Sequence, residues 1–325
     1  MKGCYSDKVH LPYGVPQGSV IGPILFTYYT RAIGNIIRNH RLQYHLYADD
    51  VQLIITFNPA IPGDAACALF KLSNCIHELQ TWLTSNKLKL NMAKTEFFAA
   101  SSDYHYINLK HLTLYLDGLE ISVSSSIKNL GVIFDHDMKM SSYVAHLSKT
   151  LNWQIGNIWR IRRFLSFDAC TNAVRTLVLS KIDYCSSLLN GISQKNLTRL
   201  QLLQNKCARL IFREPKYTHT SPLLHSLHWL PVAKRVQFRT LVHVYKVLAS
   251  STPEYLSSIL HTRHSGYSLR STAATCLSIP RSHKLAGDRA FSIIAPVLWN
   301  GLPSHIRDSH NVQTFKKNLK THLFT

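Results

Sequence analysis

The stretch Tyr47-Ala48-Asp49-Asp50 decides how this 325-residue chain is understood. Alternating apolar segments lie on either side of it, at 44–47 and 51–55. Two such segments joined by a very short connection predict a β-hairpin with the acids at its tip. Adjacent carboxylates repel each other and are costly to desolvate, and a divalent cation would offset that cost. We therefore expect either a Mg²⁺ half-site at Asp49 and Asp50 or a surface turn with two solvated acids.

A glycine-rich stretch, GVPQGSVIGPILF, lies upstream at residues 14–26. Its glycines and prolines predict a tight loop whose backbone can approach a ligand closely. An apolar, helix-like run follows, with isoleucines and tyrosines continuing to residue 37. The alternative is an ordinary loop that leads into a core helix.

Together the two stretches resemble the reverse transcriptases of non-LTR (LINE-type) retrotransposons. The loop resembles the nucleotide- and template-contacting motif of that family, and residues 47–50 match its metal-binding motif. The resemblance implies an α+β fold, in which a partial reverse-transcriptase palm (an antiparallel sheet with helices) precedes an α-helical thumb and C-terminal bundle. It implies Mg²⁺ as cofactor, with an RNA template and a DNA primer as partners. The residues it singles out for nucleotide or template binding are Pro16, Gln17, Gly18 and Tyr47.

The resemblance continues through residues 82–96, where Asn91-x-x-Lys94-Thr95 is similar to the next palm segment. It implies that Lys94 is a catalytic cation near the incoming triphosphate, and a solvated lysine at a helix end is the alternative. The stretch LGVIFD at 130–135 resembles the strand turn that grips the primer. Three later stretches resemble the C-terminal extension of jockey-like elements, at 181–185, 227–231 and 298–303.

One part of the family's site is missing from this pattern. The palm of the family has a further carboxylate on a strand upstream of the glycine-rich loop. Thirteen residues precede Gly14, and Asp7, their one acid, lacks that strand pattern. We therefore expect a fragment that begins within the palm, holds Mg²⁺ weakly and has no polymerase activity alone. A chain that folds poorly, because the hairpin strands keep an unpaired edge, is a further alternative.

Charge is distributed unevenly along the chain, whose formal net charge is +20. Residues 1–150 carry 13 Lys and Arg against 11 Asp and Glu, whereas residues 151–325 carry 24 against 6. A basic half of this kind indicates a nucleic-acid or other anionic partner. A basic nucleic-acid-binding module without catalysis is therefore the second function class, and an inert basic surface is the simplest alternative.

The clearest helix lies near residues 195–213, with Ser193 as its expected N-cap. Apolar residues recur at helical spacing at 200, 203, 207 and 210, which predicts a buried stripe. A neighbouring basic stripe, which we expect either to contact phosphates or to be a solvated helix face, consists of Arg199, Lys206, Arg209 and Arg213.

We expect a helix that is capped by Ser142 and runs to about Arg163. A second helix, capped by Ser166, should bury the residues at 174, 177, 178 and 182. Further helices are expected at 232–249 and at 312–323. The change from strands to helices divides the chain into a partial palm at 1–140, a helical thumb-like region at 141–260 and a basic C-terminal extension at 261–325. Residues 261–283 have weak periodicity and are expected to form a long loop.

Composition narrows the class of protein. No apolar stretch approaches the roughly 18 residues of a membrane span, and the first residues lack an apolar signal region. The seven cysteines are scattered without Cys-x-x-Cys pairs, as is typical of reduced thiols. We therefore expect a nuclear or cytoplasmic protein without a membrane partner. Histidine pairs at 225/228 and 261/264 leave a zinc site open, although their spacing matches no recognised zinc motif.

Overall fold

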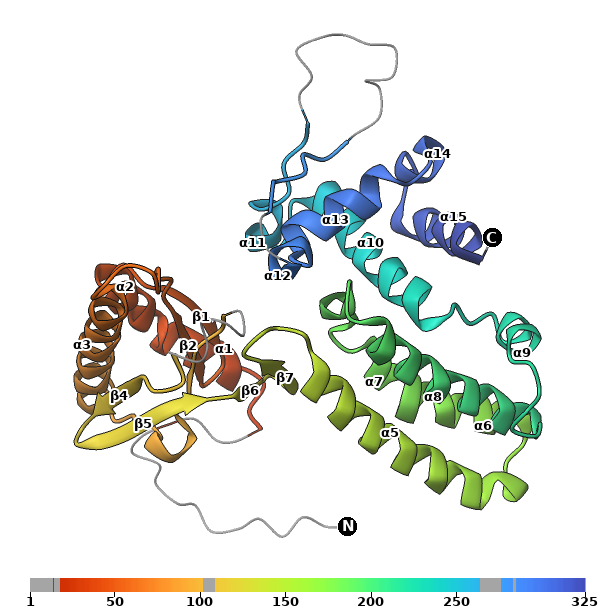
Figure 1. The fold of residues 1–325 in the computed structure, drawn as a ribbon, viewed down its shortest axis with the longest axis horizontal. Helices are drawn as coiled ribbons and strands as arrows, with labels where there is room; N and C mark the ends of the chain where they lie inside the picture. The colour runs from red at the N-terminus through yellow and green to blue at the C-terminus, as the bar shows by residue number, and fades with distance from the viewer. Residues whose placement is uncertain (1–13, 15–17, 102–108, 264–275, 283–284, 325) are drawn as a thin grey trace, which may run out of the picture. The chain divides into compact units, whose positions relative to one another are not determined.

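A computed structural model describes residues 14, 18–101, 109–263, 276–282 and 285–324. The chain separates into two compact units. Unit 1 lies within Met1–Ala99 and Tyr104–Ser124, and unit 2 lies within Ala100–Asp103 and Ser125–Thr325. Helices and small sheets together confirm the predicted mixed α and β fold (Figure 1).

Unit 1 contains most of the strands. Its elements are α1 (Gly22–Tyr29), α2 (Arg31–Asn39), β1 (Gln43–Tyr47), β2 (Asp50–Ile54), α3 (Asp64–Ser85), the 3₁₀ turn η1 (Met92–Lys94), β3 (Phe97–Phe98), β4 (Thr113–Leu116) and β5 (Leu119–Ser124). Strands β1 and β2 pair antiparallel as a separate two-stranded sheet. The second sheet has the order β3-β5-β4, in which β4 and β5 are antiparallel but β3 and β5 are parallel.

The core of unit 1 lies between α2, α3 and the sheet of β4. Ile33 and Ile37 of α2, Leu72 of α3 and Leu114 of β4 are all buried. Gly34 lets strand β1 approach α2, since a Cβ on Gly34 would lie 2.5 Å from the Tyr44 hydroxyl. This close approach holds the β1–β2 hairpin against α2.

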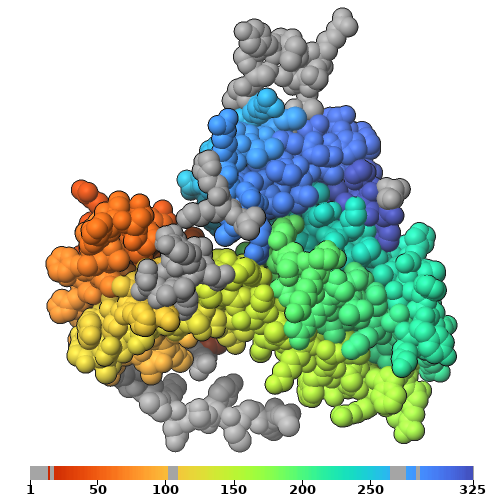
Figure 2. Space-filling view, viewed as in Figure 1, coloured from red at the N-terminus to blue at the C-terminus, as the bar shows by residue number. Residues whose placement is uncertain are grey.

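Unit 2 is mainly helical. It begins with the hairpin β6 (Ser126–Asn129) and β7 (Val132–Asp135). Its helices are α5 (Ser141–Ile161), the 3₁₀ turn η2 (Arg162–Phe164), α6 (Phe167–Val174), the π-helical turn η3 (Arg175–Leu179), α7 (Ser180–Asp183), the 3₁₀ turn η4 (Ser186–Leu189), α8 (Gln194–Phe212), α9 (Ser221–Ser226), α10 (Val232–Ser250), α11 (Glu254–Ser257), α12 (Leu285–Asp288), α13 (Phe291–Asn300), α14 (Ser304–Arg307) and α15 (Val312–Phe324). In the space-filling view, the side chains of these helices form a closely packed surface (Figure 2).

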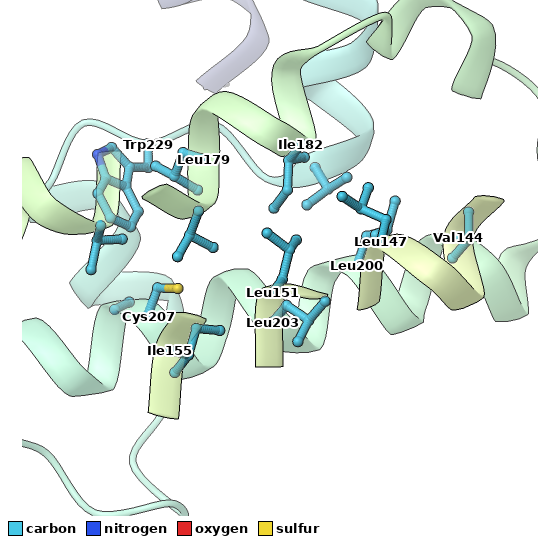
Figure 3. Close-up of a cluster of buried hydrophobic side chains, with 14 of the residues drawn as sticks. Val144, Leu147, Leu151, Ile155, Leu179, Ile182, Leu200, Leu203, Cys207 and Trp229 are labelled. Atoms are coloured by element: carbon cyan, nitrogen blue, oxygen red, sulfur yellow. The ribbon is translucent and has the colours of Figure 1, made fainter. Parts of the chain in front are cut away.

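One hydrophobic core of unit 2 joins α5 to α8. Figure 3 shows Leu147 and Leu151 of α5 facing Leu200 and Leu203 of α8, and all four are buried. The apolar stripe predicted for 200, 203, 207 and 210 is confirmed, and the Ser193 hydroxyl accepts a hydrogen bond from the amide of Asn196, as expected of an N-cap.

A second core joins α10, α13 and α15. Phe315 of α15 stacks on Tyr245 of α10 with ring centroids 4.3 Å apart, and Trp299 of α13 is buried beside them. The predicted helices at 232–249 and 312–323 are therefore confirmed.

The prediction that Ser142 is the N-cap of helix α5 is wrong. Helix α5 begins at Ser141 after Met140, which has a φ of 60° and makes no side-chain cap. The Asp135 carboxylate at the end of β7 instead accepts a hydrogen bond from the Ser142 amide. The cap therefore comes from a residue outside the local helical pattern.

The helix after Ser166 also departs from the simple pattern. Ser166 is its N-cap as predicted, because its hydroxyl accepts a hydrogen bond from the Ala169 amide. The π turn at Arg175–Leu179 then shifts the helical register. Leu177, which was predicted to face inward, is 40% exposed, and Leu179 is buried instead.

The end of the expected loop at 261–283 is partly described. Residues 264–275 and 283–284 lie outside the described residues. Thr262 forms an isolated antiparallel bridge with Leu277, whose backbone makes two hydrogen bonds to the Asn300 side chain. None of the described helices combines the length and apolar character that crossing a membrane requires.

Candidate metal and nucleic-acid site

The paired acids lie where the sequence predicts them. Strand β1 pairs with β2 so that Tyr47 lies opposite Asp50, which leaves only Ala48 and Asp49 in the connecting turn. The hairpin itself is therefore confirmed. Ala48 has a φ of 51°, in the left-handed region that favours glycine. An alanine in this conformation costs about 1–2 kcal/mol relative to an ordinary backbone.

Asp49 and Asp50 are both exposed. Within the described part of the chain, neither carboxylate makes a hydrogen bond or an ion pair with a protein group. Carboxylate oxygens without a protein cation are suitable ligands for a hard divalent ion, because Mg²⁺ takes one or two carboxylates and completes its shell with water and phosphate oxygens. The residues present therefore fit part of a magnesium site.

The rest of such a site is not supplied nearby by the residues that the structure describes. These residues contain no group of three or more His, Cys, Asp or Glu side chains that could surround a metal ion. His264, which belongs to the zinc alternative, lies outside them. The hairpin thus provides two adjacent carboxylates and no third ligand of those types.

A cavity of about 330 Å³ lies beside the hairpin, between helices α1 and α2 and strand β1. Ala48 of the turn and Leu46 of β1 line it on one side, and Arg31 and Arg38 of α2 line it on the other. Arg38 donates a hydrogen bond to the Tyr44 hydroxyl, and its guanidinium lies 5.7 Å from the centroid of that ring. The turn that carries the acids therefore adjoins a cavity with cationic side chains.

The glycine-rich loop is described at only a few positions. Pro16 and Gln17 lie outside the described residues. Gly14 and Gly18 have φ values of 86° and 89°, which side chains rarely adopt. A Cβ at either position would meet nothing within 4 Å, so backbone conformation rather than space calls for glycine there.

The helix after this loop differs from the core helix considered as the alternative. Helix α1 has no buried residue, and Ile24 and Tyr28 are 66% and 73% exposed. The chain turns at Thr30, and only the following helix α2 contributes Ile33 and Ile37 to the core. The apolar, helix-like run therefore forms two helices, and only the second contributes to the core.

Lys94 lies in the 3₁₀ turn η1 and is exposed. Its ammonium group has no hydrogen-bond or ion-pair partner among the described residues. The Asn-x-x-Lys-Thr stretch leads into a strand as expected, since β3 begins at Phe97. The role of Lys94 near a triphosphate remains a prediction.

The basic stripe of α8 is partly occupied by contacts within the protein. Lys206 Nζ donates to Asn152 Oδ1 at 2.9 Å, and Arg209 Nε donates to the Thr218 carbonyl at 3.0 Å. Arg199 and Arg213 are exposed, and Arg213 is the left-handed C-cap of the helix. Only part of the predicted stripe is therefore available for phosphate contacts.

Sequence reasoning missed the role of one arginine. Arg162, in the basic cluster at the end of α5, is 9% exposed. It donates hydrogen bonds to the carbonyls of Leu210, Ile211 and Leu165, at 2.9, 2.6 and 2.8 Å. It thus donates to two carbonyls at the C-terminus of α8 and to one between η2 and α6. The stretch Arg160-Ile161-Arg162-Arg163 does not reveal which cation is buried.

Comparison with known proteins identifies the first part of the chain. Residues 5–134 match the reverse transcriptase (RNA-dependent DNA polymerase) family model. Both the glycine-rich loop and the Asp49–Asp50 hairpin lie within this match. Reverse transcriptases use divalent metal ions and act on a nucleic-acid template and primer. No solved structure matches the chain.

Curated relatives extend the similarity past residue 134. The RNA-directed DNA polymerase from mobile element jockey of Drosophila funebris is 24% identical over 229 residues, which cover 67% of this chain and 24% of the relative. The probable RNA-directed DNA polymerase from transposon BS of Drosophila melanogaster is 25% identical over 253 residues, which cover 74% of this chain and 27% of the relative. The corresponding protein from transposon X-element of the same species is 24% identical, over 63% of this chain and 22% of the relative.

The chain spans about a quarter of the length of these relatives. The aligned share of the chain exceeds the share that the family model matches, so similarity continues into the helical unit. Residues 5–134 thus match the reverse transcriptase family model, and the chain as a whole is similar to part of the RNA-directed DNA polymerases of these mobile elements.

Proposed function

We propose that this chain contributes the metal-binding hairpin of an RNA-directed DNA polymerase that extends a DNA primer on an RNA template. In this role Asp49 and Asp50 hold Mg²⁺, Lys94 lies near the incoming triphosphate, and Pro16, Gln17 and Gly18 contact nucleotide or template. The main support is a pair of exposed carboxylates that have no protein partner among the described residues, at a strained turn inside the matched family segment. A nuclear or cytoplasmic location accompanies this proposal, since the six described cysteines are all free thiols.

The chemistry assigned to the hairpin is a phosphoryl transfer. The oxygen of the primer 3′ hydroxyl forms a bond to the α-phosphorus while the bond to pyrophosphate breaks. Bound Mg²⁺ would stabilise the negative charge on the attacking and leaving oxygens. Asp49 and Asp50 would hold the metal ion in place. Tyr47 lies opposite Asp50 in the register, so both side chains project from the same face and the exposed ring is placed to contact the nucleic acid.

Positioning is most of the catalysis of phosphoryl transfer, so two carboxylates alone are a weak site. We therefore expect the 325 residues by themselves to extend a primer poorly or not at all. Fusion of the upstream palm region of the Drosophila funebris jockey polymerase to the N-terminus should restore incorporation on an RNA template with Mg²⁺. Asp49→Asn in this chimera should lower the rate by at least about a hundredfold, because a metal ligand is lost.

Glu120→Gln is the matched control, because Glu120 is an exposed carboxylate on another hairpin of the same unit. It should leave the rate of the chimera unchanged. Equal rates for the chimera and its Asp49→Asn,Asp50→Asn variant would contradict the proposal. Rapid extension by the chain alone, abolished by Asp49→Ala, would show that the site is complete without the upstream region.

A second candidate function is nucleic-acid binding by the helical unit without catalysis. Its support is the charge of residues 151–325, which carry 24 Lys and Arg against 6 Asp and Glu. Arg199→Glu with Arg213→Glu should weaken oligonucleotide binding and lower the slope of log K against log salt concentration by about two, because two phosphate contacts are lost. Asp49→Asn should leave binding unchanged. Fluorescence anisotropy at several salt concentrations measures the affinity and its salt dependence. An unaltered slope would show that the basic stripe of α8 does not contact the nucleic acid.

A further inference from the structure

Two sequence stretches that the proposed function leaves unused meet at one cavity of unit 2. Asp183, Tyr184 and Cys185 belong to the stretch at 181–185, and Leu227, His228 and Trp229 belong to the stretch at 227–231. Both sets line a cavity of about 850 Å³, together with side chains of α10 and α15. That volume lies within the usual range of ligand pockets.

The wall of this cavity is strongly basic. Arg175, Arg235, Arg239 and Lys320 line it, and Asp183 is the one carboxylate among its lining residues. Arg235 holds Asp183 with both Nε and Nη2, and Arg239 Nη2 contacts the same carboxylate at 2.5 Å. The single acid is thus shared between two guanidinium groups, which leaves an excess of three positive charges.

The two remaining cations have no acidic partner. Among the described residues, neither Arg175 nor Lys320 makes a salt bridge or a side-chain hydrogen bond. The Lys320 ammonium lies 5.9 Å from the centroid of the Phe324 ring. Its pKa is lowered by burial and by the nearby charges of Arg235 and Arg175. These like charges repel one another, and a bound anion would relieve that repulsion.

The cavity rests on rigid elements. Trp229, Leu227 and Leu179 are 3%, 5% and 2% exposed, so its apolar floor is part of the main core. Figure 3 shows Trp229 and Leu179 within that core. The paired hydrogen bonds to Asp183 fix the plane of the Arg235 guanidinium. A preorganised guanidinium loses little conformational entropy when it binds a phosphate.

Positive charge also continues outside the cavity along helix α15, which carries Lys320. Lys316 and Lys317 precede Lys320 on α15, and Arg239 at the rim has a side chain that is 45% exposed. A single free phosphate would satisfy the cavity alone, whereas a polyanion would also neutralise these neighbours. The distribution of charge therefore favours a strand with successive phosphates.

We propose that the cavity formed by Arg175, Asp183, Arg235, Arg239 and Lys320 binds backbone phosphates of a nucleic-acid strand. This inference rests on the proposed nucleic-acid-binding role of unit 2 and gives it a specific site. The guanidinium fork of Arg175, which has no acidic partner among the described residues, matches phosphate oxygens in geometry, and Lys320 adds a point charge. The contacts involve phosphates only, so binding should depend little on base sequence.

The test uses the full chain and a fluorescent single-stranded oligonucleotide, as RNA and as DNA, with anisotropy measured over a range of salt. Arg175→Gln with Lys320→Gln removes the two unpartnered cations and leaves the Asp183 ion pairs intact. We expect binding to weaken about tenfold and the salt slope to fall by about two. Lys149→Gln with Arg160→Gln removes the same charge from exposed positions on α5 and should change binding less than about twofold.

The outcomes separate this inference from the function on which it rests. An equal loss of oligonucleotide affinity in the cavity variant and in the α5 variant, relative to the wild-type chain, would overturn the cavity site. It would leave nucleic-acid binding by unit 2 in place. Absence of wild-type binding to any oligonucleotide would overturn both. A thermal shift with inorganic pyrophosphate forms the second arm. Stabilisation by pyrophosphate that is lost in the cavity variant, without oligonucleotide binding, would assign the cavity to small free phosphates and overturn the strand proposal.

Discussion

At the scale of single residues, the acids of the hairpin and the buried arginine show opposite degrees of predictability. Asp49 and Asp50 lie in a turn whose position follows from the apolar segments on either side, so their place at the tip could be predicted from the sequence. Arg162 could not be identified in this way. Its burial depends on the carbonyls of α8, which are about fifty positions away along the chain.

Replacement of Arg162 by Met should destabilise unit 2. The change removes the guanidinium donor from three backbone carbonyls, and we expect a loss of about 3 kcal/mol in the free energy of unfolding. Urea unfolding followed by tryptophan fluorescence measures this loss. Arg163→Met is the control, because Arg163 is exposed and its guanidinium lies over the Phe164 ring, so its effect should stay within about 0.5 kcal/mol. Equal effects of the two substitutions would refute the capping role of Arg162.

At the scale of elements, regular periodicity was enough for α8, α10 and α15, whose apolar residues recur at helical spacing and are buried. It failed between α6 and α7. The π turn at 175–179 inserts an extra residue into the helical register, and no residue type in that stretch signals the insertion. For helix α1 the composition was not enough, because an apolar sequence does not specify which neighbouring element covers it.

The π turn gives a matched pair of leucines. Leu179→Ala should cost about 2–4 kcal/mol, because it leaves a cavity in the core that joins α5 to α8. Leu177→Ala should cost less than about 1 kcal/mol, because that side chain is 40% exposed. Thermal or urea unfolding of both variants compares them directly. The reverse order of stability would mean that α6 and α7 continue as one regular α-helix through 175–179.

At the scale of the whole molecule, the two units carry separate parts of the proposed function. Unit 1 holds the glycine-rich loop and the acidic hairpin, and unit 2 holds most of the excess positive charge. The uneven distribution of charge could be predicted, because charged residues can be counted along the sequence without knowledge of the fold. The basic cavity of unit 2 could not be predicted in that way, since its cations come from positions between 175 and 320 that only the packing of α7, α10 and α15 brings together.

The central claim is that Asp49 and Asp50 bind divalent metal, and Mn²⁺ binding by the intact chain tests it most directly. Water-proton relaxation or electron paramagnetic resonance would count bound Mn²⁺ as the metal is titrated, without any need for polymerase activity. We predict weak, saturable binding that Asp49→Asn,Asp50→Asn abolishes and Glu120→Gln preserves. Saturable binding of the same strength in the Asp49→Asn,Asp50→Asn variant would contradict the claim, as would a wild-type chain that binds no Mn²⁺.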